Sequence, residues 1–253
     1  MKIFFLGFLL LLFNFQNCKS QDTHIIEPCL MEISYQESYN GMGSNFALRI
    51  GKNHSQYFCY DKLRSDSLGS NQETGMILLN ELLDAAKNRQ DKSKQKGTGP
   101  GCDEYTYRNI EKNTFTTYAQ IVSTSYRIEE TIPQQDWTIN EDTTMLILGF
   151  NCYMATTHFR GRDWTVWYTE EIPVQQGPWK LGGLPGLILS AESKDFVNLK
   201  AIAVNTGNLT PITFYNYWNK KFEDVEREAF LKISNNHTLY PKGTIMTPKF
   251  ELE

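Results

Sequence analysis

The stretch that decides the fold spans residues 177–189 and reads GPWKLGGLPGLIL. Its glycines and prolines interrupt a strand-rich context before the apolar run 187–189. Pro185 and Gly186 suit the central pair of a type II turn, because proline presets φ and glycine accepts a positive φ. Gly182 and Gly183 allow another backbone or a large side chain to approach closely, since neither has a Cβ. The pattern predicts a structural corner between two strands, with a ligand-binding loop as the alternative.

Alternating sequences on both sides of this corner predict β-strands. In residues 145–157 apolar side chains recur at every second position, which predicts one uninterrupted strand with an apolar face. The members of that ladder are Leu146, Leu148, Phe150, Cys152 and Met154. Further strands are expected at 29–39, 45–51, 56–60, 114–123, 127–132, 163–169, 187–191 and 196–205. The aromatic share of 13%, mostly Tyr and Phe, also favours sheet.

Two segments, 73–89 and 219–233, have the periodicity of an amphipathic helix. Their apolar stripes are Met76, Leu79, Leu82, Leu83 and Ala86 in the first, and Phe222, Val225, Ala229 and Ile233 in the second. Many antiparallel strands with one or two helices predict an α+β fold. We expect a strongly curved antiparallel sheet or open half-barrel with the helices packed on it. A chain of 253 residues can bury a substantial core.

The chain resembles a known family in several segments. Residues 183–188 read GLPGLI, and the block from 147 to 178 and the ending TPKFEL at 247–252 are also similar to that family. On these motifs the chain resembles the GLPGLI family of Bacteroidetes envelope proteins. The ending departs from the family's usual Asn-Pro-Ile-Glu-Leu, with Thr247 in place of the Asn. The resemblance implies an envelope protein and brings no catalytic residues with it.

The N-terminus has the features of a secretory signal. Lys2 precedes the apolar run 3–13, which is too short to span a bilayer, and small residues at Cys18 and Ser20 suit cleavage before Gln21. We therefore expect a signal peptide at 1–20 and a single domain at 21–253. In the alternative, Cys18 is the lipidated cysteine of a lipoprotein. Either way the protein is expected to be exported to the periplasm or the outer membrane, and no later segment is apolar enough for a transmembrane helix.

Four cysteines remain beyond the processed region: Cys29, Cys59, Cys102 and Cys152. An oxidising compartment permits two disulfides among them, in three connectivities. The pairing of Cys29 with Cys59 and of Cys102 with Cys152 joins neighbouring segments and is the pairing we expect.

Charge and motifs exclude several function classes. The net charge of −4 and the absence of a basic block argue against a nucleic-acid partner. There is no phosphate loop, dinucleotide fingerprint or nucleophile elbow, so no cofactor is expected. The four histidines, His24, His54, His158 and His237, are dispersed rather than spaced as metal ligands.

The sequence offers only weak candidates for a catalytic pair of residues. Cys152 and His158 are six positions apart on one expected strand, about 20 Å by strand rise, and burial raises the pKa of a thiol. Glu170 and Glu171 point to opposite faces of a strand end, unlike the paired carboxylates of a hydrolase. No catalytic residue is therefore assigned.

Aromatic residues beside the corner give the best case for binding. The candidates are Trp164, Trp167, Tyr168 and Trp179, with Leu184, Pro185 and Gly186 of the corner. Such residues fill cores by default, but on a concave sheet they offer a pocket. The leading hypothesis is a non-enzymatic envelope protein that binds a lipid, a peptide or an envelope protein. The alternatives are a hydrolase or thiol enzyme built from distant residues, and a structural accessory of an outer-membrane complex.

Overall fold

The computed structural model describes residues 22–87, 99–241 and 249–253. The strands are β1 (His24–Glu27), β2 (Met31–Tyr39), β3 (Met42–Ile50), β4 (His54–Cys59), β5 (Tyr105–Asn109), β6 (Thr114–Ile121), β7 (Thr124–Thr131), β8 (Thr138–Ile147), β9 (Phe150–Phe159), β10 (Arg162–Thr169), β11 (Leu187–Ser193), β12 (Val197–Asn205), β13 (Ile212–Phe214) and β14 (Phe222–Asp224). The helices are α1 (Tyr60–Gly69), α2 (Gln72–Lys87), α3 (Arg227–Ser234) and a 3-10 turn at His237–Leu239. The expected signal peptide, with Cys18, lies outside the described residues.

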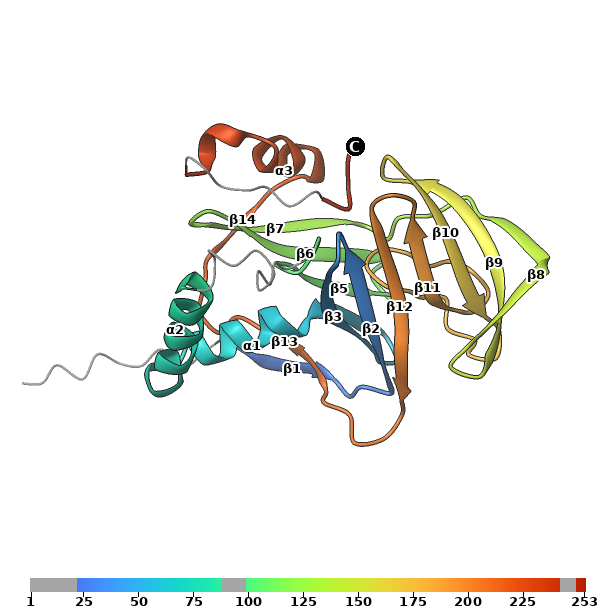
Figure 1. Cartoon of the computed structure of the whole chain (residues 1–253), viewed down its shortest axis with the longest axis horizontal. Helices are drawn as coiled ribbons and strands as arrows, with labels where there is room; N and C mark the ends of the chain where they lie inside the picture. The colour runs from blue at the N-terminus through green and yellow to red at the C-terminus, as the bar shows by residue number, and fades with distance from the viewer. Residues whose placement is uncertain (1–21, 88–98, 242–248) are drawn as a thin grey trace, which may run out of the picture.

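One large sheet dominates these parts of the chain. Its twelve strands follow the order β14-β7-β6-β5-β4-β3-β2-β12-β11-β10-β9-β8, while β1 and β13 form a separate two-stranded sheet. Neighbouring strands are antiparallel except β14, which runs parallel to β7. The large sheet bends strongly without closing into a barrel (Figure 1). The α+β prediction of a strongly curved, open sheet is confirmed.

The main core forms where the two arms of the bent sheet face each other. On β2 alternate residues such as Ile33 and Tyr35 point inward and are fully buried, as the period of a strand requires. The Tyr35 hydroxyl donates a hydrogen bond of 2.7 Å to the Ile188 carbonyl, which ties β2 to β11 over the intervening strand β12. Leu187, Ile188 and Leu189 are all fully buried, so the apolar run after the corner is a core strand.

The single strand predicted at 145–157 is wrong. The chain turns at Leu148 and Gly149, whose φ angles are +52° and +87°, and continues as the β8–β9 hairpin. A positive φ at both central residues fits a tight hairpin turn. The apolar ladder is therefore divided between two strands, and Leu146 is 74% exposed instead of inward-facing. A leucine with positive φ is uncommon, which is why the sequence did not indicate the turn.

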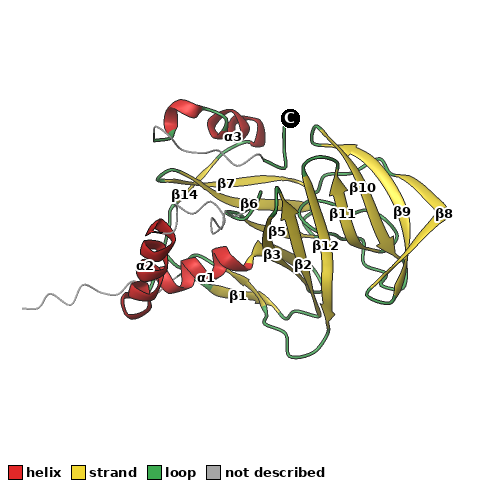
Figure 2. Cartoon of the chain, in the orientation of Figure 1, coloured by secondary structure: helices red, strands yellow, loops and turns green. Residues whose placement is uncertain are grey.

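The helices lie beside the curved sheet (Figure 2). Helix α1 packs against β3 and β4, α2 packs against α1, and α3 packs against β7. The helix predicted at 73–89 is confirmed as α2, but α1 was not expected, because it has no apolar stripe and no buried residue. The helix predicted at 219–233 is partly wrong, since residues 222–224 form β14. Phe222 packs edge-on against Tyr118 with ring centroids 4.8 Å apart, and this contact holds the segment extended until α3 begins at Arg227.

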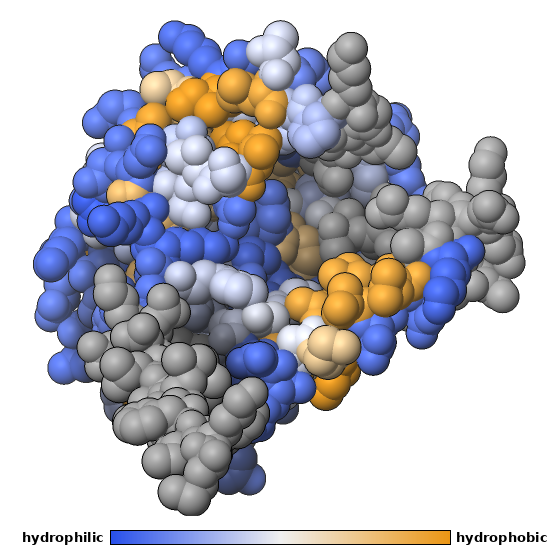
Figure 3. Space-filling model, turned by 90° about the vertical axis from the view of Figure 1, so that its left-hand side faces the viewer, coloured by the Kyte–Doolittle hydropathy of each residue, from blue (hydrophilic) through white to orange (hydrophobic). Residues whose placement is uncertain are grey.

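The end of the molecule that carries the helices exposes apolar side chains between hydrophilic ones (Figure 3). On α2 the residues involved are Met76, Ile77, Leu79, Leu82 and Leu83, each 46–59% exposed. Within the described ranges, none of the helices is both long and apolar enough to cross a membrane.

The disulfide pairing predicted from the sequence is wrong. Cys59 bonds to Cys102, while Cys29 and Cys152 are free thiols. Cys59 ends β4 and Cys102 comes just before β5, and these strands pair side by side, so the two cysteines meet. Cys29 lies at the opposite end of this strand pair, where its thiol contacts the Ile50 carbonyl. Cys152 lies on β9, and six strands separate β9 from β5.

Candidate functional site

The aromatic residues singled out from the sequence mainly fill the core. Trp164, Tyr168 and Trp179 are 1–3% exposed, and Trp167 is partly buried. Trp164 stacks on Trp179 at 5.7 Å, and Trp179 stacks on Phe250 at 5.1 Å. Of the four predicted residues, only Trp179 reaches the cavity described below.

The glycine-rich corner is structural, but not by the turn expected. Gly183, not Gly186, has the positive φ of +85°, so the predicted type II turn is wrong. Gly186 is needed for space: a Cβ there would lie 1.9 Å from the Thr169 carbonyl oxygen. Leu184 is buried and Pro185 is exposed, so the corner presents little surface for a ligand.

A cavity of about 260 Å³ opens between β6 and β7, α3 and the C-terminal segment. One side is apolar, formed by strand residues and by rings from α3 and the C-terminal segment. Its members are Ala119, Ile121, Ile128, Phe230, Leu231 and Phe250. The cavity thus lies between the main core and a smaller apolar cluster that packs α3 onto the sheet.

The other side of the cavity carries a buried ion-pair network. Lys180, only 3% exposed, contacts both Glu130 and Glu251. Arg227 adds a bond of 2.6 Å from its Nε to Glu251, and Arg160 pairs with the other oxygen of Glu130. Burial alone would raise the pKa of Glu251, but Lys180 and Arg227 hold that pKa below its ordinary value. Three cations therefore share two carboxylates.

Some polar groups of the cavity residues lack partners. Thr117 Oγ1 on β6 and Arg227 Nη2 are buried without a hydrogen bond in the described chain. The Lys249 ammonium lies 5.5 Å from the centre of the Phe230 ring, and among the described residues no carboxylate is within ion-pair distance of it. Buried polar groups are normally satisfied, so these unmade hydrogen bonds set the cavity region apart from the well-packed core.

Glu104, which also lines the cavity, has an unusual carboxyl group. Burial raises its pKa to about 8, and the neighbouring Asp103 adds to the shift. The group is therefore mostly protonated at neutral pH. The backbone positions it, since Glu104 directly precedes β5 and follows the disulfide at Cys102.

A second buried acid lies beneath the cavity wall. Glu37 on β2 is fully buried, both of its carboxylate oxygens lack partners, and burial raises its pKa to about 8. Gly99 from the cavity wall packs so closely on this carboxyl that a Cβ there would lie 1.5 Å from Oε1. The open cavity and the filled core thus meet at Glu37.

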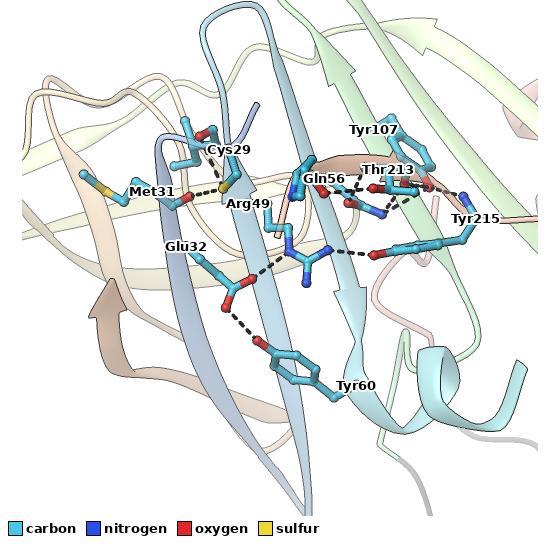
Figure 4. Close-up of polar contacts among 11 residues, drawn as sticks. Cys29, Met31, Glu32, Arg49, Gln56, Tyr60, Tyr107, Thr213 and Tyr215 are labelled. Carbon is cyan, nitrogen blue, oxygen red and sulfur yellow. Dashed lines mark hydrogen bonds and ion pairs between the residues drawn. The ribbon is translucent and has the colours of Figure 1, made fainter. Parts of the chain in front are cut away.

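The opposite face of the sheet has a polar cluster of a different kind (Figure 4). Arg49 donates to Glu32 at 2.6 Å and to the Tyr215 hydroxyl at 2.8 Å. Gln56 donates to the Thr213 carbonyl at 2.8 Å, which fastens β13 to β4. Since these groups satisfy one another, the cluster serves to hold the small sheet in place.

The structure also places the sequence-derived catalytic and metal candidates. Cys152 is fully buried and burial raises its pKa to about 11, while His158 is exposed and pairs with Asp163 at 2.7 Å. His54 pairs with Glu27 at 3.0 Å. Among the described residues, Cys59, Asp61 and Cys102 lie close enough together to be considered as metal ligands. The sulfurs of the two cysteines are, however, joined in the disulfide.

Sequence reasoning missed most of the cavity. Glu104, Thr117 and Arg227 belong to no motif, while Lys180 lies in the stretch 177–189 and Lys249 in the ending 247–252, where neither was singled out. The signal that could have led to part of it was the ending 247–252, because Phe250 and Glu251 form one wall.

These features define a β-rich domain with an internal cavity of ligand size. The chain belongs to the family described as "N-glycanase peptide, N-terminal domain", which matches residues 58–226. No curated protein matches the chain in sequence.

Two solved structures of PNGF-II, in the C2 and P21 space groups, are similar to this chain. Each is 18% identical and covers 80% of this chain, with TM-scores of 0.53 and 0.54. The chain spans about a third of the length of these structures, 32% and 33%, and at this identity the likeness shows the fold alone. A DUF1329 family protein from Desulfovibrio piger ATCC 29098 is 8% identical, covering 72% of this chain and 88% of that chain, with a TM-score of 0.27.

Proposed function

We propose that this protein is an exported binding protein without catalytic activity, and that its ligand occupies the cavity between β6, β7, α3 and the C-terminal segment. The observation that carries the proposal is the cavity itself, where an apolar wall faces an ion-pair network in which three cations share two carboxylates. Such a cavity can bury the apolar part of a ligand while the charged side orients its polar group.

The size of the cavity limits the ligand. About 260 Å³ is slightly below the range of drug-sized pockets, so a single ring or a short chain fits and a whole lipid does not. The relation to an N-glycanase domain makes a saccharide unit one candidate. Membership of the GLPGLI family and a place in the cell envelope remain part of this proposal, supported by the motifs and the apolar N-terminus.

Blocking the cavity tests the proposal. Ala119 is 6% exposed on the cavity floor, so Ala119→Phe should fill the space, whereas Ala203→Phe places the same ring at a partly exposed position of β12. Wild-type protein and the Ala203→Phe control, purified gently from their own host, should retain a small molecule in native mass spectrometry. Ala119→Phe should retain none. Retention of the same added mass by all three proteins would refute the cavity as the binding site.

Hydrolysis is the second candidate function, because Glu104 is a carboxyl group with a strongly raised pKa in a cavity. Glu251 is not a matching base, since Lys180 and Arg227 already neutralise it. If chemistry occurs, the retained molecule should be converted slowly by wild-type protein and not by Glu104→Gln. Unchanged ligand with both proteins supports the binding function.

A further inference from the structure

The buried network beside the cavity has a surplus of positive charge. The network contains three cations, Arg160, Lys180 and Arg227. Among the described residues, these cations form ion pairs with two carboxylates, those of Glu130 and Glu251. The ion pairs therefore leave one positive charge unbalanced. Lys180 is buried and the other four groups are partly buried, so a further anion would balance the charge of the network.

Unused hydrogen-bond donors accompany this surplus. Arg227 Nη2 and, within the same network, Arg160 Nε are buried without acceptors in the described chain. Lys249 adds a second unpaired cation at the cavity, although burial lowers its pKa. The missing groups are thus acceptors, not donors.

The acids nearest to the cavity do not fill this role. Glu104 is mostly protonated at neutral pH, and Asp103 is exposed to solvent. Glu251 is already shared between Lys180 and Arg227. No carboxylate of the described residues is left to neutralise Lys249 within ion-pair distance.

We infer that the cavity takes a small ligand bearing a carboxylate, with this group directed to Arg227 and Lys249 and its body lying on Phe230, Phe250 and Ile128. Arginine and lysine bind carboxylates through short charge-assisted hydrogen bonds, and the apolar wall accepts a ring or short chain. The inference rests on the proposed binding function and names its ligand class. Both an acidic sugar and an aromatic or short fatty acid offer this chemistry.

Matched pairs of probe molecules separate the contribution of the carboxylate to the binding affinity from that of the rest of the ligand. Calorimetric titration at pH 7 would compare D-glucuronate with D-glucose, and benzoate with benzyl alcohol. The carboxylate of at least one pair should bind at least tenfold more tightly than its neutral partner. A preference for D-glucuronate over D-glucose would indicate an acidic sugar as the ligand, and a preference for benzoate over benzyl alcohol would indicate an apolar acid.

Lysine variants test the assigned contact. Lys249→Met keeps most of the apolar stem and should reduce the preference for carboxylate at least fivefold. Lys221→Met removes a charge from an exposed position outside the cavity and should leave the preference unchanged. Circular dichroism of both variants checks that they fold.

The outcomes separate the two proposals. If the neutral probes bind as tightly as the acids, or if the molecule retained from the host carries no acid group, the carboxylate inference fails while binding in the cavity stands. If no molecule is retained and no probe binds, the proposed function itself fails.

Discussion

The glycine-rich corner and the cavity are connected by the stacked rings of Trp164, Trp179 and Phe250, yet they differ in how completely they are packed. At the corner Trp164, Leu184 and Leu187 fill the space almost completely, and Gly186 leaves no room for even a methyl group. At the cavity Phe250 continues the stack, but polar atoms of Thr117 and Arg227 remain without partners. The difference teaches that the stretch 182–189 stabilises the fold, whereas most of the cavity wall comes from other parts of the chain.

The largest effect should come from adding one methyl group to the filled corner. Gly186→Ala places a Cβ against the Thr169 backbone, which cannot move aside, so the free energy of unfolding should fall by about 3 kcal/mol. Gly207→Ala is the matched control, since nothing lies within 4 Å of a Cβ there. Urea denaturation of both variants measures the comparison. Equal stability of the two would show that the corner is not tightly packed.

An intermediate effect is expected at Glu37, where the cavity meets the filled core. The pKa of Glu37 is raised to about 8 in the folded protein, so folding favours its neutral form. The stability gained from this group is full below its ordinary pKa near 4.5 and is lost as the pH rises through about 8. At pH 9 Glu37→Gln should therefore be more stable than wild type by at least about 1 kcal/mol.

The control for this experiment is Glu192→Gln on β11, an exposed carboxyl. Denaturation curves between pH 5 and pH 9 should show a wild-type decline that Glu192→Gln shares and Glu37→Gln lacks. Parallel curves for all three proteins would mean that Glu37 does not titrate in this range.

The smallest effect is expected in the open cavity. Thr117→Val replaces a buried hydroxyl that has no partner and should raise the free energy of unfolding by about 1 kcal/mol. Thr106 is equally buried, but its hydroxyl donates to the Tyr57 carbonyl at 3.2 Å, so Thr106→Val should lower it by about 1 kcal/mol. Thermal denaturation of the ligand-free proteins measures both signs. Destabilisation by Thr117→Val would indicate that this hydroxyl is satisfied.

The fold could be predicted because its evidence is local. Alternation in β2, β10 and β12 and the stripe of α2 follow from the periods of strands and helices, and they gave the α+β class and the curved sheet. Two errors came from geometry that no local pattern encodes. Leu148 adopts a positive φ, and Phe222 is held in an extended segment by Tyr118.

The site could not be predicted because it depends on distant contacts. Lys180 meets Glu130 and Glu251 only after the sheet has bent and the C-terminal segment has returned to it. The pairing of Cys59 with Cys102 likewise follows from strand neighbours rather than from proximity in sequence.

The bond between Cys59 and Cys102 has a consequence for how this domain can diversify. It clamps the base of the α1–α2 excursion, so the register of β4 and β5 does not depend on what is inserted between them. We therefore expect changes in the length or sequence of these helices to leave Asp103 and Glu104 in place in the cavity wall.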